Sequence, residues 1–362
     1  MEVKRISSLL KRGLRARRKL RGGVHRLWER ARRRAAAPHA AAENVERAAS
    51  IATRVTGLPQ TDFAIRVSVL SSENRALVRL HEVLPAAQPE SCRPLLRMIE
   101  KCSARPQEYH FYRLVAARTP APERVPAPAL YGAIDVGFKL SNHLRYAIYL
   151  EDVGLPALAD RSPQRASALA RSISLLSTLS LPSEFKVGRA IRLSAELLSN
   201  LLSRAERAGH TRHGPTAMKL EEMVVGWPNI LTVRQLNLPA VPGHNDLHLD
   251  NVRLRLANGA KPEVVFIDWE AFAWNYLGAD LHHFVREAMM QPERAPFFEV
   301  LRSHYVDEVS KNYSISMLQI DVAAHAYALT RAMSRVIRKG SRRELYLTFK
   351  LYDRLAVLLA TL

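Results

Sequence analysis

Short alternating patterns of apolar and polar residues characterise the first half of the chain. They occur at 63–70 (FAIRVSVL), 75–83 (RALVRLHEV) and, after a proline-containing loop, 94–101 (PLLRMIEK). A period of two is typical of strands that bury one face. The pattern therefore predicts a three-stranded antiparallel meander.

A helix and two more strands are predicted before the middle of the chain. The segment 107–118 (QEYHFYRLVAAR) has helical spacing, and a proline-rich connector follows it. Strand patterns then occur at 132–140 (GAIDVGFKL) and 146–153 (YAIYLEDV).

Helical spacing of apolar residues dominates beyond Gly154. It occurs at 168–179 and 191–208, and several further helices are expected after Asn312. Strands followed by helices predict an α+β chain of two lobes with a cleft between them. We expect an N-terminal arm at 1–50, a small antiparallel-sheet N-lobe at 51–152 and a larger helical C-lobe at 153–362.

The net charge of +20 is concentrated at the N-terminus. Residues 1–34 carry 14 Lys or Arg against two acidic residues, a net +12. Large apolar residues are interleaved among them, which is typical of a basic amphipathic helix on an anionic membrane surface. A solvated arm is the alternative, and nucleic-acid binding is disfavoured because no base-reading module accompanies the charge.

Composition favours a cytoplasmic protein. The 362 residues are 48% hydrophobic, enough to bury a core, yet no apolar run reaches the roughly 18 residues that span a bilayer, and the N-terminus lacks the roughly 7–15 residue apolar core of a secretory signal. Cys92 and Cys102 are too few for a disulfide framework or a zinc site, and we expect both to be buried. If the arm binds lipid, the protein is peripheral at the inner face of the membrane.

A dense group of polar residues lies at 241–251 (VPGHNDLHLDN). One interpretation is a metal-dependent hydrolase, with His244 and His248 four residues apart and Asp246 and Asp250 as further ligands. The Pro-Gly pair before the first histidine instead predicts a loop. In a loop the four-residue spacing no longer places two histidines on one helix face, so this interpretation is an alternative.

Phosphoryl transfer explains more of the pattern. The apolar strand 263–270 (EVVFIDWE) follows the polar segment and delivers Asp268. Asn251 and Asp268 offer the oxygen ligands that Mg²⁺ prefers. Asp246 offers a separate carboxylate that could orient a hydroxyl and accept its proton.

These motifs resemble a known family. HNDLHLDN at 244–251 and FIDWE at 266–270 look like the catalytic loop and metal-binding motif of the aminoglycoside phosphotransferase and choline kinase family of small-molecule kinases. AFAWNYLGADLHHF at 271–284 is similar to the choline and ethanolamine kinase branch. The resemblance spans roughly 60–360. It implies a protein-kinase-like fold, ATP and Mg²⁺ as cofactors, Asp246 as the base, and Asn251 and Asp268 as metal ligands.

The resemblance is looser in the first half. The family's phosphate-covering turn corresponds to 69–80 (VLSSENRALVRL), so Ser71, Ser72 and Asn74 are the expected phosphate contacts. Serine and glutamate replace the family's usual glycines there, which reduces backbone freedom for cradling phosphates.

Other nucleotide contacts follow from the resemblance. Arg97 corresponds to the phosphate-gripping residue, with Arg79 as an alternative, and Glu108 to the helix carboxylate that pairs with it. Leu150 and Glu151 fall in the hinge that contacts adenine.

Supporting roles are expected for residues around the motifs. His244 is expected to position the catalytic loop by packing, and Asp280 to anchor that loop through backbone hydrogen bonds. Trp269 is expected in the core, and Glu270 either beside the metal or at the surface.

The sequence therefore predicts an ATP-dependent phosphotransferase that acts on a hydroxyl of a small molecule. Amino alcohols, aminoglycoside-like molecules and sugar or lipopolysaccharide-type acceptors stay open. The alternatives are a catalytically weak kinase-like binding module, and a membrane or nucleic-acid adaptor that acts through 1–34. The oligomeric state is not predicted.

A basic segment at 331–343 (RAMSRVIRKGSRR) bears on the acceptor. Roughly the last 60 residues contain no tryptophan to cage a quaternary amine by cation–π attraction. The segment is either a solvated basic turn or a site for an acceptor that carries phosphate or carboxylate. Its basic residues are Arg331, Arg335, Arg338, Lys339, Arg342 and Arg343.

Overall fold

The computed structural model describes most of the chain beyond the N-terminal arm. The described residues are 45–73, 76–87, 93–116, 125–135, 144–154, 162–179, 193–210, 214–255 and 263–362. They divide into two compact units. The first contains the described residues up to Ala104 together with Ile134–Tyr149, and the second contains Arg105–Ala133 and Leu150–Leu362. The helix predicted at 1–34 lies outside the described residues.

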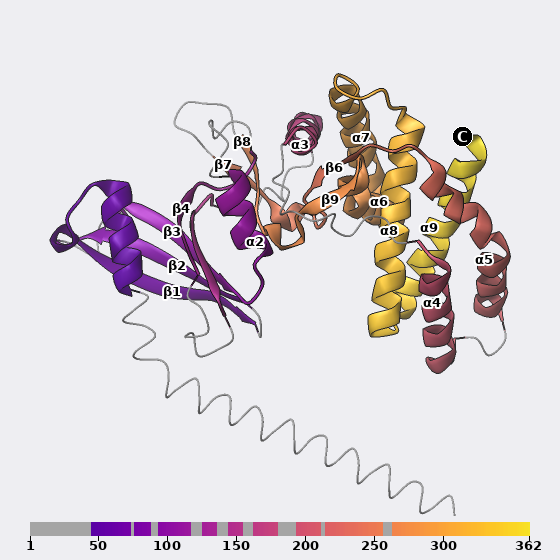
Figure 1. Cartoon of the computed structure of the whole chain (residues 1–362), viewed down its shortest axis with the longest axis horizontal. Helices are drawn as coiled ribbons and strands as arrows, with labels where there is room; N and C mark the ends of the chain where they lie inside the picture. Colours follow the sequence, from indigo (N-terminus) through magenta and orange to yellow (C-terminus); the bar gives the residue numbers. More distant parts are fainter. Residues whose placement is uncertain are drawn as a thin grey trace, which may run out of the picture. The chain divides into compact units, whose positions relative to one another are not determined.

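The strands of the first half form one five-stranded sheet in the order β1-β2-β3-β5-β4 (Figure 1). They are β1 (Phe63–Glu73, after the 3-10 turn η1, Gln60–Asp62), β2 (Ala76–Pro85), β3 (Leu96–Ser103), β4 (Leu130–Asp135) and β5 (Tyr146–Glu151). The pairs β1–β2 and β2–β3 are antiparallel, so the predicted meander is confirmed. A bulge interrupts β1 between Val69 and Ser71.

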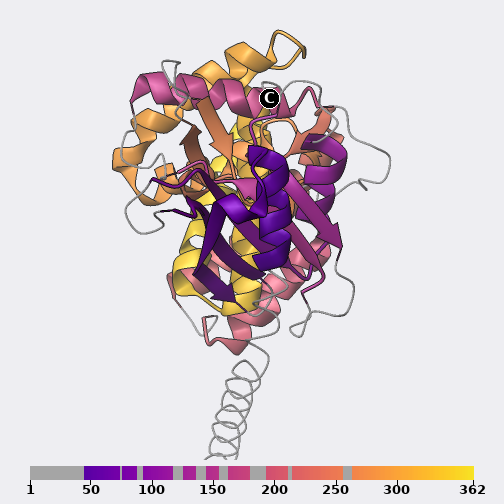
Figure 2. The same ribbon diagram turned by 90° about the vertical axis from the view of Figure 1, so that its left-hand side faces the viewer.

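One face of this sheet is buried. The helix formed by residues 45–56 crosses over strands β1–β3 (Figure 1, Figure 2). It buries Ala48, Ile51 and Ala52. On β3 the buried Met98 and Cys102 alternate with the exposed Arg97, as expected of a strand with one covered face.

An ionised carboxylate, that of Glu100, lies within this buried face. Its Oε2 accepts hydrogen bonds from Arg79 Nη1 at 2.8 Å and His81 Nε2 at 2.9 Å, and its Oε1 accepts one from the Tyr149 hydroxyl at 3.1 Å. Burial alone would raise the pKa of Glu100, but His81 and Arg79 outweigh burial and lower the pKa to about 2. Arg79 is therefore held in an ion pair inside the first unit.

The second unit begins with helix α2 (Gln107–His110), which continues in a wider π-type turn, η2 (Phe111–Ala116). Phe111 is fully buried and stacks on Trp269, with ring centroids 3.9 Å apart. This stacking fixes α2 beside the segment that carries the predicted metal motif. Trp269 is itself fully buried.

Two pairs of antiparallel strands frame the polar segment. Strand β6 (Ala240–Gly243) pairs with β9 (Ala273–Tyr276), and β7 (Val252–Arg255) pairs with β8 (Glu263–Phe266). Strand β8 is the apolar strand predicted from EVVFIDWE. Because β8 runs antiparallel to β7, its last residue pairs with the first residue of β7, and Asp268 follows near that point.

Helices make up the rest of the second unit, as the α+β prediction requires. They are α3 (Pro163–Leu176), α4 (Ala195–Arg207), α5 (Pro215–Leu231), α6 (His282–Met290), α7 (Ala295–Val309), α8 (Met317–Lys339) and α9 (Arg342–Thr361), with short turns η6 (Thr232–Gln235), η7 (Leu249–Asn251), η8 (Trp269–Ala271), η9 (Ala279–Leu281) and η10 (Pro292–Arg294). Among the helices that the structure describes, none has the length and apolarity to cross a membrane.

Helix α8 is central to this unit and packs against α4, α6 and α9 (Figure 1). It starts with a capping box, in which Ser316 Oγ accepts from Gln319 N and Gln319 Oε1 accepts from Ser316 N. Gly340 ends it with a left-handed φ of 65°, which glycine adopts without steric cost. Residues at each end of the helix therefore determine where it begins and where it ends.

A close contact between two helices gives a stability prediction. A Cβ at Gly226 of α5 would lie 2.0 Å from the hydroxyl oxygen of Tyr352 in α9 but 3.3 Å from the ring carbon Cζ. Gly226→Ala should lower the free energy of unfolding by about 1 kcal/mol, because an overpacking cost of about 1–3 kcal/mol exceeds the helix-propensity gain of about 1 kcal/mol. Chemical denaturation would measure the difference.

The matched control is the Tyr352→Phe background, which removes the clashing hydroxyl. There the same glycine substitution should be neutral or stabilising. Equal destabilisation in both backgrounds would rule out the hydroxyl contact as the cause.

Candidate active site

Residues 244–248 of the polar segment form a loop between strand β6 and the turn η7. β6 ends at Gly243, and the 3-10 turn at Leu249–Asn251 leads into β7. His244 and His248 both lie outside any helix. The shared helix face on which the hydrolase interpretation depends is therefore absent from this described segment.

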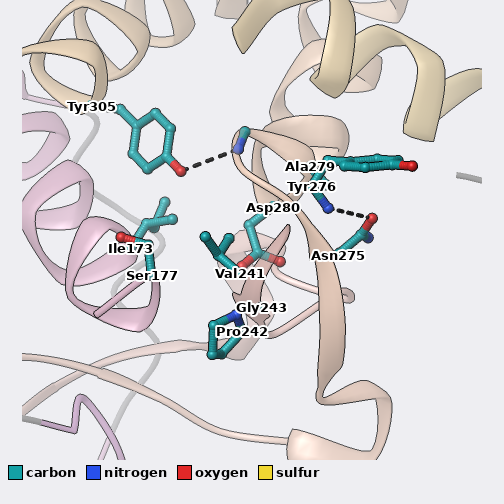
Figure 3. Close-up of a pocket in the computed structure, with 11 residues that line it drawn as sticks. Ile173, Ser177, Val241, Pro242, Gly243, Asn275, Tyr276, Ala279, Asp280 and Tyr305 are labelled. Carbon is teal, nitrogen blue, oxygen red and sulfur yellow. Dashed lines mark hydrogen bonds between the residues drawn. The ribbon is translucent and has the colours of Figure 1, made fainter. Parts of the chain in front are cut away.

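The carboxylate of Asp280 holds the start of this loop. Its Oδ2 accepts a hydrogen bond from the backbone N–H of His244 at 2.9 Å, and its Oδ1 accepts one from that of Asn245 at 2.6 Å. A Cβ at Gly243 would lie 3.0 Å from Oδ2, so glycine permits the close approach visible in Figure 3. Burial raises the pKa of Asp280 to about 6, and the two backbone N–H groups oppose that rise.

Asn245 fastens the loop to β9. It adopts a left-handed φ of 63°, which asparagine tolerates better than most residues. Its Nδ2 donates to the carbonyl oxygens of Gly243 and Ala273, both at 2.9 Å, and its Oδ1 accepts from Asn275 Nδ2 at 2.5 Å. Asn275 Oδ1 in turn accepts from Tyr276 N (Figure 3). The loop backbone is thereby bound on both sides.

The turn after β9 is held by helix α7. Gly278 has a φ of 95°, and its N–H donates to the Tyr305 hydroxyl at 3.2 Å (Figure 3). Sequence reasoning did not identify Tyr305, and it noted Asn275 and Gly278 only as parts of a motif. The positions of Asn275 and Gly278, a few residues before Asp280, were the sequence feature that could have identified these two residues.

His244 lies in the core behind the loop. Its Nε2–H donates to the carbonyl oxygen of Ile267 at 2.9 Å, and its ring lies 4.7 Å from that of Trp269. Burial lowers the pKa of His244 to about 4, so the ring is neutral at physiological pH.

Asp246 follows on the loop, with a partly exposed side chain. Its Oδ1 accepts hydrogen bonds from Arg331 Nη2 at 2.8 Å and from His283 Nε2 at 3.2 Å. Burial opposes ionisation, but His283 and Arg331 outweigh it and hold the pKa of Asp246 well below its ordinary value. The carboxylate is therefore charged, and sequence reasoning did not foresee either partner.

Asn251 and Asp268 are linked through the backbone. Asn251 Nδ2 donates to the carbonyl oxygen of Asp246 at 3.0 Å, while Ile267 N donates to the carbonyl oxygen of Asn251 at 2.9 Å. Asp268, the next residue, has a left-handed φ of 66°. The side-chain nitrogen of Asn251 is thus hydrogen-bonded to the loop backbone. Its side-chain oxygen, Oδ1, is the atom suited to bind a cation.

Three carboxylates gather at the end of β8. Oxygen atoms of Glu108, Asp268 and Glu270 lie within 4.8 Å of one another. Like charges at this separation repel, and a cation relieves the repulsion. Oxygen donors of this kind fit Mg²⁺ rather than a softer metal, so the residues present match the metal that the resemblance implies.

Arg97 and Glu108 belong to different units. Arg97 lies on β3 with its side chain 48% exposed and its Nε 3.7 Å from Glu82 Oε1. Glu108 is buried, and its Oε1 accepts from the backbone N–H of Trp269 at 3.2 Å. Within the second unit, Glu108 therefore contacts the segment that carries the predicted metal motif.

The predicted hinge residues lie at the end of β5. Leu150 is buried. Glu151 forms a two-pronged ion pair with Arg255, whose Nε and Nη2 lie 2.9 Å and 2.6 Å from the carboxylate oxygens. This pair ties the hinge strand to β7.

The predicted phosphate-covering turn is described only in part. Ser71 is exposed on β1, directly after the bulge. The side chain of Ser72 and the whole of Asn74 lie outside the described residues.

Comparison with known proteins identifies a family. Residues 103–311 match the sequence profile of a family described as the phosphotransferase enzyme family. Among curated proteins, no sequence matches the chain significantly.

Solved structures share the fold. A provisionally assigned aminoglycoside phosphotransferase from Ralstonia eutropha JMP134 has a TM-score of 0.53 at 13% identity, covering 86% of this chain and 98% of that one. An aminoglycoside phosphotransferase from Alicyclobacillus acidocaldarius has a TM-score of 0.53 at 13% identity, covering 82% of this chain and 90% of that one. A thermostable mutant of aminoglycoside phosphotransferase APH(4)-Ia, in a ternary complex with AMP-PNP and hygromycin B, has a TM-score of 0.50 at 10% identity. The match covers 82% of this chain and 95% of that one. The predicted kinase-like fold is confirmed, whereas the choline kinase branch stays a prediction.

Buried histidines should make the fold sensitive to mild acid. Burial lowers the pKa of His244 and of His325 to about 4. Between about 6.5, the unfolded value, and 4, the unfolded chain binds protons that the folded chain does not, so stability falls as pH falls. The free energy of unfolding should drop by about 1–2 kcal/mol per histidine from pH 7 to pH 5.

Urea denaturation across this pH range would measure the effect. His325→Gln removes a histidine whose Nδ1 bonds to the Asp321 carbonyl within helix α8, and it should reduce the fall in the free energy of unfolding by that histidine's contribution. The raised pKa of Asp280 acts in the opposite direction over this range, so the histidine effect is read from the difference between the two proteins. Equal pH dependence in both would contradict a neutral buried His325.

Proposed function

The chain belongs to the phosphotransferase enzyme family, and we propose that it transfers the γ-phosphate of ATP to a hydroxyl group of a small molecule. The observation that carries this proposal is the backbone linkage of three groups. Asn251 Nδ2 bonds to the carbonyl of Asp246, and Ile267 N bonds to the carbonyl of Asn251, directly before Asp268. Base and metal ligands are thereby held in one rigid arrangement.

Asp246 is the group that receives the acceptor. Its charged carboxylate accepts a hydrogen bond from the acceptor hydroxyl, which orients the oxygen for in-line attack, and it takes the proton as the new bond to phosphorus forms. The bonds from Asp280 and Asn245 to the surrounding backbone keep this carboxylate in place. Preorganisation of this kind lowers the barrier without conformational cost during the reaction.

Asn251 and Asp268 are the proposed metal ligands, with Glu108 and Glu270 as nearby carboxylates. Mg²⁺ held by these residues would supply positive charge that neutralises the negative charge developing during phosphoryl transfer. The carboxylate cluster supports this assignment, because three acidic groups within 4.8 Å of one another favour a cation.

Nucleotide binding is proposed for the first unit and the hinge. The ternary complex of the similar aminoglycoside phosphotransferase contains AMP-PNP. Arg97 is the better candidate for the phosphates, since Arg79 is held by the buried Glu100. Leu150 and Glu151 are the proposed adenine-contacting segment, with Ser71, Ser72 and Asn74 at the phosphates.

Asp246→Asn should leave ATP binding intact and lower turnover by about 10²–10⁴-fold, the range typical of general-base loss. An ADP-release assay over a panel of alcohols would identify an acceptor and then measure the variant with it, while calorimetry would follow ATP binding. Turnover equal to that of the unmodified protein would remove Asp246 from this role.

Asp268→Ala should abolish the dependence of ATP affinity on Mg²⁺, because the proposed carboxylate ligand of the metal would be lost. Calorimetric titration with and without Mg²⁺ would measure it. Asp250→Ala is the matched control, since this carboxylate lies in the same region with its side chain 72% exposed. The control should keep the Mg²⁺ dependence, and its retention in Asp268→Ala would contradict the ligand assignment.

A further inference from the structure

Two arginines of α8, Arg331 beside Asp246 and Arg335 one turn further along, are less exposed than the other basic residues of the 331–343 segment. Arg331 Nη2 lies 2.8 Å from Asp246 Oδ1. Arg335 is four residues further, on the same face of the helix, and the two side chains are only 21% and 19% exposed. The remaining basic residues, Arg338, Lys339, Arg342 and Arg343, are exposed.

Positive charge exceeds negative charge around this group. Arg286 of α6 donates to Glu344 Oε1, and Arg335 Nη1 lies 4.0 Å from the same oxygen. Three guanidinium groups, those of Arg286, Arg331 and Arg335, therefore share two carboxylates, those of Asp246 and Glu344. The cluster is left with one excess positive charge.

The neighbouring histidines neither add to nor offset this positive charge, and some guanidinium N–H groups have no hydrogen-bond acceptor among the described residues. Burial lowers the pKa of His282 and that of His283, so both are neutral at physiological pH. The Nε atoms of Arg331 and Arg286 are buried with no hydrogen-bond partner among the described residues. Within the same described part, Arg335 has only the 4.0 Å contact to Glu344. The cluster thus has both charge and hydrogen-bond donors available for an anion.

We propose that the acceptor is an anionic alcohol, with a phosphate or carboxylate group that binds Arg331 and Arg335. This inference rests on the proposed phosphotransferase function. A planar guanidinium fork matches the oxygen pairs of such groups. An amine-bearing acceptor would meet like charge at the same place, and uncharged alcohols would leave the excess charge unpaired.

The geometry limits the size of the acceptor. A hydroxyl on Asp246 and an anion on Arg331 would lie within about 8 Å of each other, given hydrogen bonds of about 2.8 Å. A hydroxy acid or a sugar phosphate has this spacing. When it binds, Asp246 exchanges the guanidinium for a hydroxyl donor and Arg331 exchanges the carboxylate for the acceptor's anion. Neither charge is then left buried and unpaired.

Two matched acceptor sets would test the charge preference. One is glucose 6-phosphate, glucose and glucosamine, and the other is glycerol 3-phosphate, glycerol and 2-amino-1,3-propanediol. In an ADP-release assay with the full chain, ATP and Mg²⁺, the phosphate-bearing member should exceed its neutral partner at least tenfold in kcat/KM, and the amine should be poorest. Preference for the neutral or amine member would overturn the inference.

Arg331→Gln tests the residue. It should lower the ratio of kcat/KM for the anionic acceptor to kcat/KM for its neutral partner by about 100-fold, as expected when a charged hydrogen bond is lost, because any effect on Asp246 itself is common to both acceptors. Arg331→Lys keeps the charge and should retain part of the preference. Arg338→Gln, an exposed position on the same helix, is the control and should behave like the unmodified protein. An equal loss for all acceptor classes in Arg331→Gln would show a merely structural role.

The two proposals fail in different ways. If no alcohol of any charge releases ADP, the result counts against the proposed function, and calorimetric titration with glycerol 3-phosphate decides the anion site. Binding to the unmodified protein that is lost in Arg331→Gln supports the site. Failure of the unmodified protein to bind rejects it.

Discussion

The burial of one carboxylate, that of Asp280, determines the form of the loop at 244–248. A buried charge is costly unless hydrogen bonds replace its hydration, and Asp280 obtains two of them from the consecutive backbone N–H groups of His244 and Asn245. Those bonds require the left-handed turn at Asn245, which places Asp246 next on the loop. The Asp280 side of the contact is steadied in turn by the bond between Gly278 and Tyr305.

Local pattern was enough to predict much of the fold. Alternation predicted the meander, and motif chemistry pointed to the loop, to the strand before Asp268 and to the family. Helix α5 was not predicted, because Gly226 and Pro228 weaken its helical pattern. The partners of Asp246 were not predicted either. Arg331 is 85 residues away in sequence and His283 is 37, so only tertiary packing brings them to the carboxylate.

The choice between Arg97 and Arg79 shows how strand geometry limits a sequence argument. Successive side chains of a strand point to opposite faces, so Arg97 and Glu100, three residues apart on β3, lie on opposite sides of the sheet. Glu100 faces the buried side and holds Arg79 there. The sequence contains this alternation, but it does not state which face a helix covers. Only the packing of residues 45–56 makes one arginine structural and leaves the other exposed.

Helix α8 carries the residues that we propose select the acceptor. The proposed base and metal ligands lie on the loop and next to the short strands around it, whereas Arg331, beside the base, and Arg335, one turn further, belong to a helix whose ends are fixed by their own caps and whose other faces fill the core. On this proposal, exchanges at positions 331 and 335 alter which molecules are accepted without rebuilding the loop. In evolutionary terms, one turn of one helix is a site at which members of such a family can diverge in substrate while their reaction is conserved.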